Sequence, residues 1–266
     1  MNENEPGLPE ITEGTFANRI GTGERRVPCV LLLDTSASMG FKSRATGSAH
    51  SAEVEEPASS AKLPIDLLNE SLGELRADLI DDPQAREAVD LSVVTFGGPP
   101  KDLFDGWRRV DDCEFPKLEP SGNTPLGAAL LMAVDMIEDR KRWYRQEGIS
   151  IYKPWVFILT DGEPDQGSEL KEATTRIRKL QGLDGVEGGG KLIVQAVCTD
   201  NGDLAMGRLK AITQRTYFLS DVAYKELFLW LSLSLRSVSQ STPGIAMELP
   251  EPPPQMTLSE AREIIP

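Results

Sequence analysis

Two runs of large apolar residues, each ending at or near an aspartate, constrain the fold of this chain more than any other feature. They are VPCVLLLD at 27–34 and KPWVFILTDG at 153–162. Continuous apolar runs of this length are typical of strands that are covered on both faces, as in parallel sheets. Similar runs predict further strands at 89–98 and 191–198.

Segments with helical spacing of apolar residues alternate with these strands. The pattern is clearest over 64–80, where Pro64 suits the first turn of a helix. Helices are also predicted over 125–144, 169–180 and 223–237. Because strands and helices alternate, the sequence predicts an α/β fold with a doubly wound, mostly parallel sheet and helices on both faces.

Changes in composition predict one domain with flanking and inserted segments. Residues 1–25 are acidic with few large apolar residues, which indicates a flexible N-terminal arm. The domain is expected over 26–238, with a Ser- and Ala-rich flexible loop inserted at 41–61. Residues 239–266 are Pro-rich and acidic, which is typical of an extended tail.

The charge balance argues against two classes of partner. The chain has 28 Lys and Arg against 42 Asp and Glu, a formal net charge of −14. Nucleic acids and anionic membranes attract clustered Lys and Arg, so neither is expected to bind. The N-terminus lacks the apolar core of a signal peptide, and the apolar stretch at 227–235 is too short to span a bilayer. Three cysteines without paired spacing suit a reducing cytoplasm, which is the predicted location.

Oxygen-bearing side chains gather where two of the predicted strands end. Asp34 and Asp161 each come at the end of an apolar run, and Ser36 and Ser38 follow Asp34 at alternate positions. In doubly wound sheets, ligands bind beyond the carboxyl ends of the strands. These side chains are therefore candidates for a binding site.

A third segment, SGNTPLG at 121–127, is expected to reach the same edge of the sheet. Gly122 allows the backbone to turn tightly. Pro125 favours the first helical position, which would leave Thr124 near the N-cap. The three segments could therefore converge, with Thr124 adding a third hydroxyl group.

Together these residues form an all-oxygen donor set. Hydroxyls and carboxylates suit a hard cation such as Mg²⁺ or Mn²⁺, whereas zinc prefers His or Cys ligands. The alternative is a set of ordinary turn and cap residues, because Asp, Ser and Thr are favoured at such positions anyway. The candidate metal ligands are Asp34, Ser36, Ser38, Thr124 and Asp161.

The stretches DTSAS, SGNTPLG and ILTDGEP, in this order, resemble the motifs of the von Willebrand factor A domain over the whole predicted domain. The resemblance is greatest to bacterial members of the tellurium-resistance type. It implies a metal-ion-dependent adhesion site, in which Ser36, Ser38 and Thr124 bind the cation directly. Asp34 and Asp161 would act through coordinated waters. A protein partner would then supply an Asp or Glu carboxylate to the vacant position.

The same resemblance implies a non-enzymatic adaptor in a bacterial stress-response, phage-defence or signalling system. Its partner would be a protein, with no nucleic acid, no membrane and no small-molecule substrate. Partner contacts are expected from the loops around the metal, including Gly122, Asn123, Gly162 and Glu163.

Two other functions stay open at this stage. A structural subunit would keep the fold without using its metal. A phosphatase of the haloacid-dehalogenase type also places an Asp after its first apolar strand, but its second Asp would fall at Ser36, which removes the general acid and base. The inserted loop could supply Glu53, Glu55 or Glu56 as an internal ligand, or be solvated.

Overall fold

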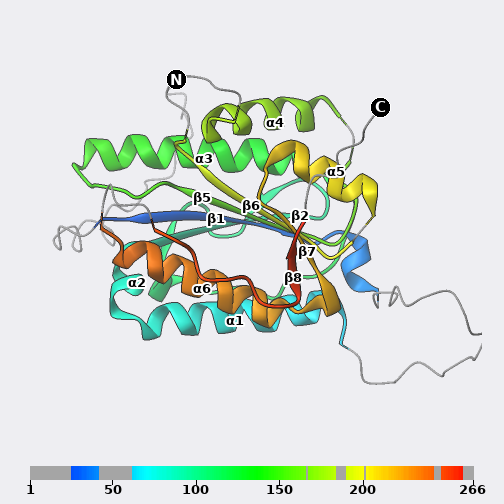
Figure 1. The fold of residues 1–266 in the computed structure, drawn as a ribbon, viewed down its shortest axis with the longest axis horizontal. Coiled ribbons are helices and arrows are strands. Elements are labelled where there is room, and N and C mark those ends of the chain that lie inside the picture. Colours follow the sequence, from blue (N-terminus) through cyan, green and yellow to red (C-terminus); the bar gives the residue numbers. More distant parts are fainter. Residues whose placement is uncertain are drawn as a thin grey trace, which may run out of the picture.

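A computed structural model describes most of the predicted domain and part of the tail (Figure 1). The described residues are 25–41, 62–165, 167–183, 190–200, 202–242 and 247–259. The predicted N-terminal arm and inserted loop, with Glu53, Glu55 and Glu56, lie almost entirely outside these residues. The predictions made for them are therefore not tested by the structure.

The described residues form one eight-stranded sheet with the order β3-β2-β1-β5-β6-β7-β8, and β4 lies beside β2. The central strands are parallel, namely β2 (Val89–Phe96), β1 (Val27–Asp34), β5 (Trp155–Thr160), β6 (Ile193–Cys198) and β7 (Thr216–Leu219). Short antiparallel strands pair at the edges, namely β3 (Lys101–Asp102), β4 (Arg108–Arg109) and β8 (Met256–Leu258). The strand order reverses between β1 and β5, which confirms the predicted doubly wound, mostly parallel sheet.

Helices cover both faces of the sheet, as predicted (Figure 1). One layer contains α1 (Pro64–Asp81), α2 (Pro83–Ala88) and α6 (Tyr224–Gln240). The other contains α3 (Leu126–Gln146), α4 (Ser168–Gln181) and α5 (Asp203–Ile212). Short 3-10 helices are η2 (Ala37–Gly40), η3 (Val110–Asp112) and η4 (Ser220–Val222). No helix among the described residues is long and apolar enough to cross a bilayer.

The two layers explain why the central strands are apolar at every position. Along β1, Leu31 and Leu33 pack into the core under α1 and α6, whereas Val30 and Leu32 pack into the core under α3. Successive side chains of a strand point to opposite faces, so a strand covered on both faces buries all of them.

Helix α2 was not predicted from the sequence. Asp82 ends α1 and caps α2, because its side chain accepts a hydrogen bond from the Ala85 N–H at 2.8 Å. Pro83 occupies the first position of α2, where its missing N–H costs nothing. The Asp82-Pro83 pair is therefore the sequence signal for this helix.

The prediction of an extended tail from 239 onwards was wrong for two of its parts. Helix α6 continues to Gln240, and residues 247–259 return to the domain. There β8 pairs with β7, and the Trp230 indole N–H donates a 2.9 Å hydrogen bond to the Pro250 carbonyl. This Pro-rich segment is held in place because β8 pairs with the backbone of β7 and the Met256 side chain is buried.

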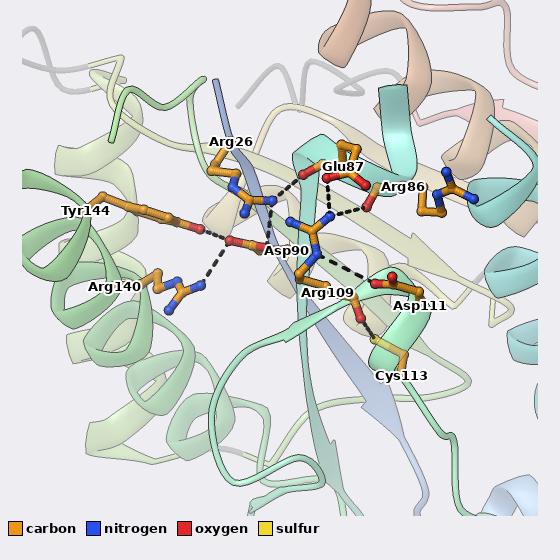
Figure 2. A network of polar contacts seen from close by, with 9 residues as sticks. All are labelled: Arg26, Arg86, Glu87, Asp90, Arg109, Asp111, Cys113, Arg140 and Tyr144. Carbon is orange, nitrogen blue, oxygen red and sulfur yellow. Dashed lines mark hydrogen bonds and ion pairs between the residues drawn. The ribbon is translucent and has the colours of Figure 1, made fainter. Parts of the chain in front are cut away.

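A network of charged side chains lies around the amino ends of the central strands (Figure 2). The Asp90 carboxylate is buried and accepts hydrogen bonds from Arg140, at 3.0 Å, and from the Tyr144 hydroxyl. Arg26 lies 3.6 Å from the other carboxylate oxygen of Asp90. The Arg140 guanidinium also stacks on the Trp143 ring, 4.2 Å from its centroid. A buried acid with several partners of this kind stabilises one packing arrangement of β2 against α3.

We expect Asp90→Ala to lower the free energy of unfolding by about 3–5 kcal/mol, because it leaves Arg140 partly buried without its carboxylate. Urea unfolding monitored by circular dichroism measures the change. The matched control is Asp139→Ala on the exposed face of α3, which should change stability by less than about 0.5 kcal/mol. Equal effects of the two variants would show that the buried network does not stabilise the fold.

Candidate metal centre

Asp34, the last residue of β1, is fully buried and organises the turn that follows it. One carboxylate oxygen accepts a hydrogen bond from the Ser36 N–H at 2.8 Å. The other accepts one from the Thr160 hydroxyl, at 2.5 Å, on the neighbouring strand β5. Burial raises the pKa of the Asp34 carboxyl, and these hydrogen bonds oppose that rise.

The hydroxyls of the turn form a continuous chain with the second aspartate. The Oγ atoms of Ser36 and Ser38 are 2.9 Å apart. Ser38 Oγ donates a 2.8 Å hydrogen bond to Asp161 Oδ1, just beyond the end of β5. Side chains from two distant parts of the sequence thus meet at the point where the strand order reverses.

The electrostatics of this cluster favour a cation. Burial and the nearby negative charge of Asp34 raise the pKa of Asp161 to about 6, while the hydrogen bond from Ser38 lowers it. Among the described residues, neither Asp34 nor Asp161 takes part in an ion pair with Lys or Arg. Two neighbouring carboxylates without a counter-charge repel one another, and a divalent cation would remove that repulsion.

The third predicted segment packs directly against the turn after β1. The Ser121 N–H donates to the Thr35 carbonyl at 2.7 Å, and the Ala37 N–H donates to the Gly122 carbonyl at 3.1 Å. Gly122 has a φ of +66°, and a Cβ there would lie 2.8 Å from the Gly97 carbonyl oxygen. Only glycine suits both this backbone conformation and this close approach.

Thr124 lies between this segment and the loop that follows Asp161. It is buried, and its carbonyl accepts a 3.0 Å hydrogen bond from the Asp165 N–H. It lies next to the N-cap of α3, as predicted, but Pro125 does not take the predicted first helical position. Pro125 is itself the N-cap, with a ψ of 58°, so the helix begins one residue later than predicted, at Leu126. Thr124 is therefore one residue outside the helix, and its hydroxyl is not used as a cap.

The structure thus brings four predicted ligands, Asp34, Ser36, Ser38 and Asp161, together through their side chains. The fifth, Thr124, belongs to a segment that packs against the turn after β1, and its own main chain contacts Asp165. Thr160 and Gly97 also shape the site and were missed from the sequence. Thr160 holds Asp34, and a Cβ at Gly97 would lie 2.1 Å from the Thr35 carbonyl oxygen. A threonine directly before the strand-ending Asp161 is the signal that could have found the first.

Two of the residues expected to contact a partner already have partners within the chain. The Asn123 amide donates to the Asp165 carboxylate, and Glu163 forms an ion pair with Arg208. These contacts hold the loops on either side of Asp161 in place. Whether Gly122, Asn123, Gly162 and Glu163 also touch a partner stays a prediction.

The donor set fits a hard cation. Within the described ranges, no group of three or more His, Cys, Asp or Glu residues is arranged to hold a metal ion. A cation beside Asp34 and Asp161 would therefore also need neutral oxygen ligands, for which the Ser and Thr hydroxyls are candidates. Neutral oxygen ligands suit Mg²⁺ or Mn²⁺ better than zinc.

Solved structures share this fold at low sequence identity. The PilB minor pilin from Streptococcus sanguinis is 13% identical with a TM-score of 0.56, and the match covers 81% of this chain and 63% of that one. A von Willebrand factor type A protein from Catenulispora acidiphila is 13% identical with a TM-score of 0.52, and the match covers 80% of this chain and 43% of that one. This chain therefore spans less than two thirds of either protein.

No protein-family model matches the sequence, and no curated protein matches it significantly. At these identities the structural likeness shows the fold alone. That fold is of the von Willebrand factor A type, as the sequence motifs predicted. The narrower resemblance to the tellurium-resistance type stays a prediction.

Gly122→Ala should separate steric collision from backbone strain when it is compared with Gly148→Ala. Gly148 has a similar φ of +68°, but no atom lies within 4 Å of its added Cβ. We expect Gly148→Ala to cost about 1–2 kcal/mol of stability. Gly122→Ala should cost about 1–3 kcal/mol more, because the segment must move away from Gly97. Equal losses in thermal unfolding would contradict the close packing of the segment at 121–124.

Asp161→Asn should stabilise the protein in EDTA at neutral pH. The pKa of Asp161 is about 6 in the folded chain against 3.8 as its ordinary value, so the folded chain binds this proton more tightly than the unfolded chain. The carboxyl therefore favours folding at low pH, and that contribution is lost as the pH rises through 6. At pH 7 we expect the variant to be more stable by about 1 kcal/mol.

Unfolding curves between about pH 4 and pH 8 measure this difference, which should shrink as the pH falls below 6. Saturating Mg²⁺ should then stabilise the native sequence more than the variant. A variant that is less stable than the native chain in EDTA at every pH would refute the repulsion between the two carboxylates.

Proposed function

We propose that this chain is a non-enzymatic, metal-dependent protein-binding module. The observation that carries the proposal is the hydrogen-bonded chain from Ser36 through Ser38 to Asp161, beside the buried carboxylate of Asp34. Hydroxyls fixed by carboxylates in this way present their oxygen atoms in a defined arrangement. The fold places them at the strand-order reversal, where ligands of doubly wound sheets bind.

In this proposal, Ser36, Ser38 and Thr124 hold Mg²⁺ or Mn²⁺ directly, and Asp34 and Asp161 act through bound waters and through the hydroxyls. Because the direct ligands from this chain are neutral, most of the charge of the ion is left uncompensated. When bound, the cation supplies a positive charge that attracts an Asp or Glu carboxylate from a protein partner. Asp34 keeps the turn in the shape that this requires.

Exposed apolar side chains at the same edge support a protein partner. Phe41, directly after η2, is 69% exposed, and Leu204 in the first turn of α5 is 65% exposed. Both η2, the blue turn after β1, and the start of α5 lie at the carboxyl edge of the sheet (Figure 1). Large apolar groups next to a polar anchor are typical of protein–protein interfaces.

The cellular setting that we propose rests on the sequence motifs. Their resemblance to bacterial proteins of the tellurium-resistance type supports a cytoplasmic adaptor in a stress-response, phage-defence or signalling system. An enzymatic role has less support, because Ser36 stands where a phosphatase of the haloacid-dehalogenase type would need its second Asp.

Thr124→Val tests the metal site, because it replaces one proposed ligand by a group of similar shape. We expect it to weaken Mn²⁺ binding by about 10- to 100-fold, as measured by titration calorimetry or by the electron paramagnetic resonance of free Mn²⁺. Thr175→Val on the exposed face of α4 is the matched control and should leave binding unchanged. A native chain that binds no Mn²⁺, or a Thr124→Val variant that binds it equally well, would refute the proposed site.

Affinity purification of the full chain, followed by mass spectrometry, tests the function itself. Partners should be retained with Mg²⁺ and lost with EDTA or with Thr124→Val. A set of partners that is the same under all three conditions would exclude metal-dependent binding. Turnover of p-nitrophenyl phosphate that depends on Mg²⁺ and on Asp34 would show instead that the chain is a phosphatase.

A further inference from the structure

Four basic side chains gather where the end of α3 meets the residues just before β5 and β6. Lys141 and Arg145 are one turn apart on α3, and Lys191 lies close enough to Lys141 for their charges to repel one another. A Cβ added at Gly190, directly before Lys191, would lie 3.8 Å from Lys153 Nζ. We call Lys141, Arg145, Lys153 and Lys191 the basic patch.

The charges of the basic patch are not balanced by acids of the described domain. None of its four side chains takes part in an ion pair within the described ranges. Burial and the positive charges of Lys191 and Arg145 lower the pKa of Lys141, although Glu138 opposes this. An acidic group that reached the patch would relieve the repulsion.

The helix dipole explains only part of this cluster. Cations are favoured near the C-terminus of a helix, which accounts for Lys141 and Arg145. Lys153 and Lys191 lie outside the helices, and their side chains are exposed, as is that of Arg145. In a chain with a net charge of −14, an exposed group of cations without partners is a candidate surface for an acidic segment.

The chain enters the domain next to the basic patch. The Tyr152 N–H donates a 2.8 Å hydrogen bond to the Arg26 carbonyl, and the Arg25 guanidinium lies over the Tyr152 ring, 5.4 Å from its centroid. Arg26 also meets α3 around their shared partner Asp90 (Figure 2). Because Tyr152 directly precedes Lys153, the chain before Arg25 begins beside the patch.

That preceding part of the chain carries the opposite charge. Residues 1–18, which lie outside the described residues, contain no Lys or Arg. Their carboxylates are those of Glu3, Glu5, Glu10 and Glu13. Glu13 and Arg25 are twelve positions apart, a length of chain that can extend by up to roughly 40 Å. The four carboxylates can therefore reach the basic patch of the same chain.

We propose that the acidic segment at 1–18 docks on the basic patch of its own chain. Single exposed ion pairs are weak, but a short connection keeps the carboxylates near the patch at an effective concentration on the order of millimolar. The basic patch lies at the amino ends of the strands, so docking leaves the candidate metal centre at the carboxyl ends free. The inference is thus independent of the proposed function.

Paramagnetic relaxation in the full, ¹⁵N-labelled chain tests the docking. A nitroxide is attached at Thr12→Cys, between Glu10 and Glu13, and the three native cysteines are buried and should not react. We expect the amide signals of the basic patch to broaden at low salt. The broadening should be lost in 1 M NaCl, where charges are screened beyond about 3 Å. No broadening at low salt, or broadening that salt does not change, would overturn the proposal.

Charge variants identify the two surfaces. Lys153→Gln with Lys191→Gln should reduce the broadening about fivefold, and both side chains are exposed, so the variant is expected to fold. Replacing all four glutamates of the segment by Gln should abolish it. Lys117→Gln with Lys171→Gln is the matched control, because it removes the same charge at exposed positions outside the patch and should change nothing. Equal effects of the two lysine pairs would refute docking at the patch.

A mixed sample distinguishes docking within one chain from docking between copies. It combines the nitroxide-labelled chain at natural isotope abundance with a ¹⁵N-labelled chain that carries no nitroxide. We expect the basic patch of the second chain to show no broadening at the concentration used above. Broadening as strong as in the single-chain sample would show that the segment docks on a second copy, and would overturn the proposal.

Discussion

The buried carboxylate of Asp34 holds the carboxyl ends of β1 and β5 in place, and the candidate site depends on it. One oxygen fixes the turn after β1 through the Ser36 N–H, and the other fixes the end of β5 through the Thr160 hydroxyl. A single side chain therefore sets both the shape of the turn and its position relative to Asp161. Burying this carboxylate is unfavourable, as the raised pKa shows, and the hydrogen bonds offset only part of that cost.

The buried acidic side chains at the amino ends of the central strands have different partners from those at the carboxyl ends. At the amino edge, Asp90 is surrounded by Arg140, Arg26 and the Tyr144 hydroxyl, so its charge is compensated within the chain (Figure 2). At the carboxyl edge, Asp34 and Asp161 receive hydrogen bonds from hydroxyl and N–H groups only. The fold therefore compensates the charge of the buried acid at the amino ends within the chain, and it leaves Asp34 and Asp161 at the carboxyl ends without a basic partner among the described residues. Such a separation is expected where binding requires a site that is unfavourable when empty.

The sequence predicted those features that depend on local pattern. Apolar runs located β1 and β5, and the Asp and Ser residues after them marked the candidate site. The strand β8 could not be predicted, because its pairing with β7 joins distant segments and its flanks are rich in proline. The predicted position of Pro125 was wrong by one residue: proline favours the first turn of a helix, but Pro125 has a ψ of 58° and is the N-cap of α3.

The arrangement of the hydroxyls explains how a strongly acidic chain could bind an acidic partner. Ser38 donates its only proton to Asp161, and its oxygen still has lone pairs available for a cation. In the proposed site, the carboxylates would act on the ion through bound waters and would not neutralise it. Repulsion from the net charge of −14 is screened beyond about 8 Å at physiological salt, so in the proposed complex the local field of the ion would decide the contact.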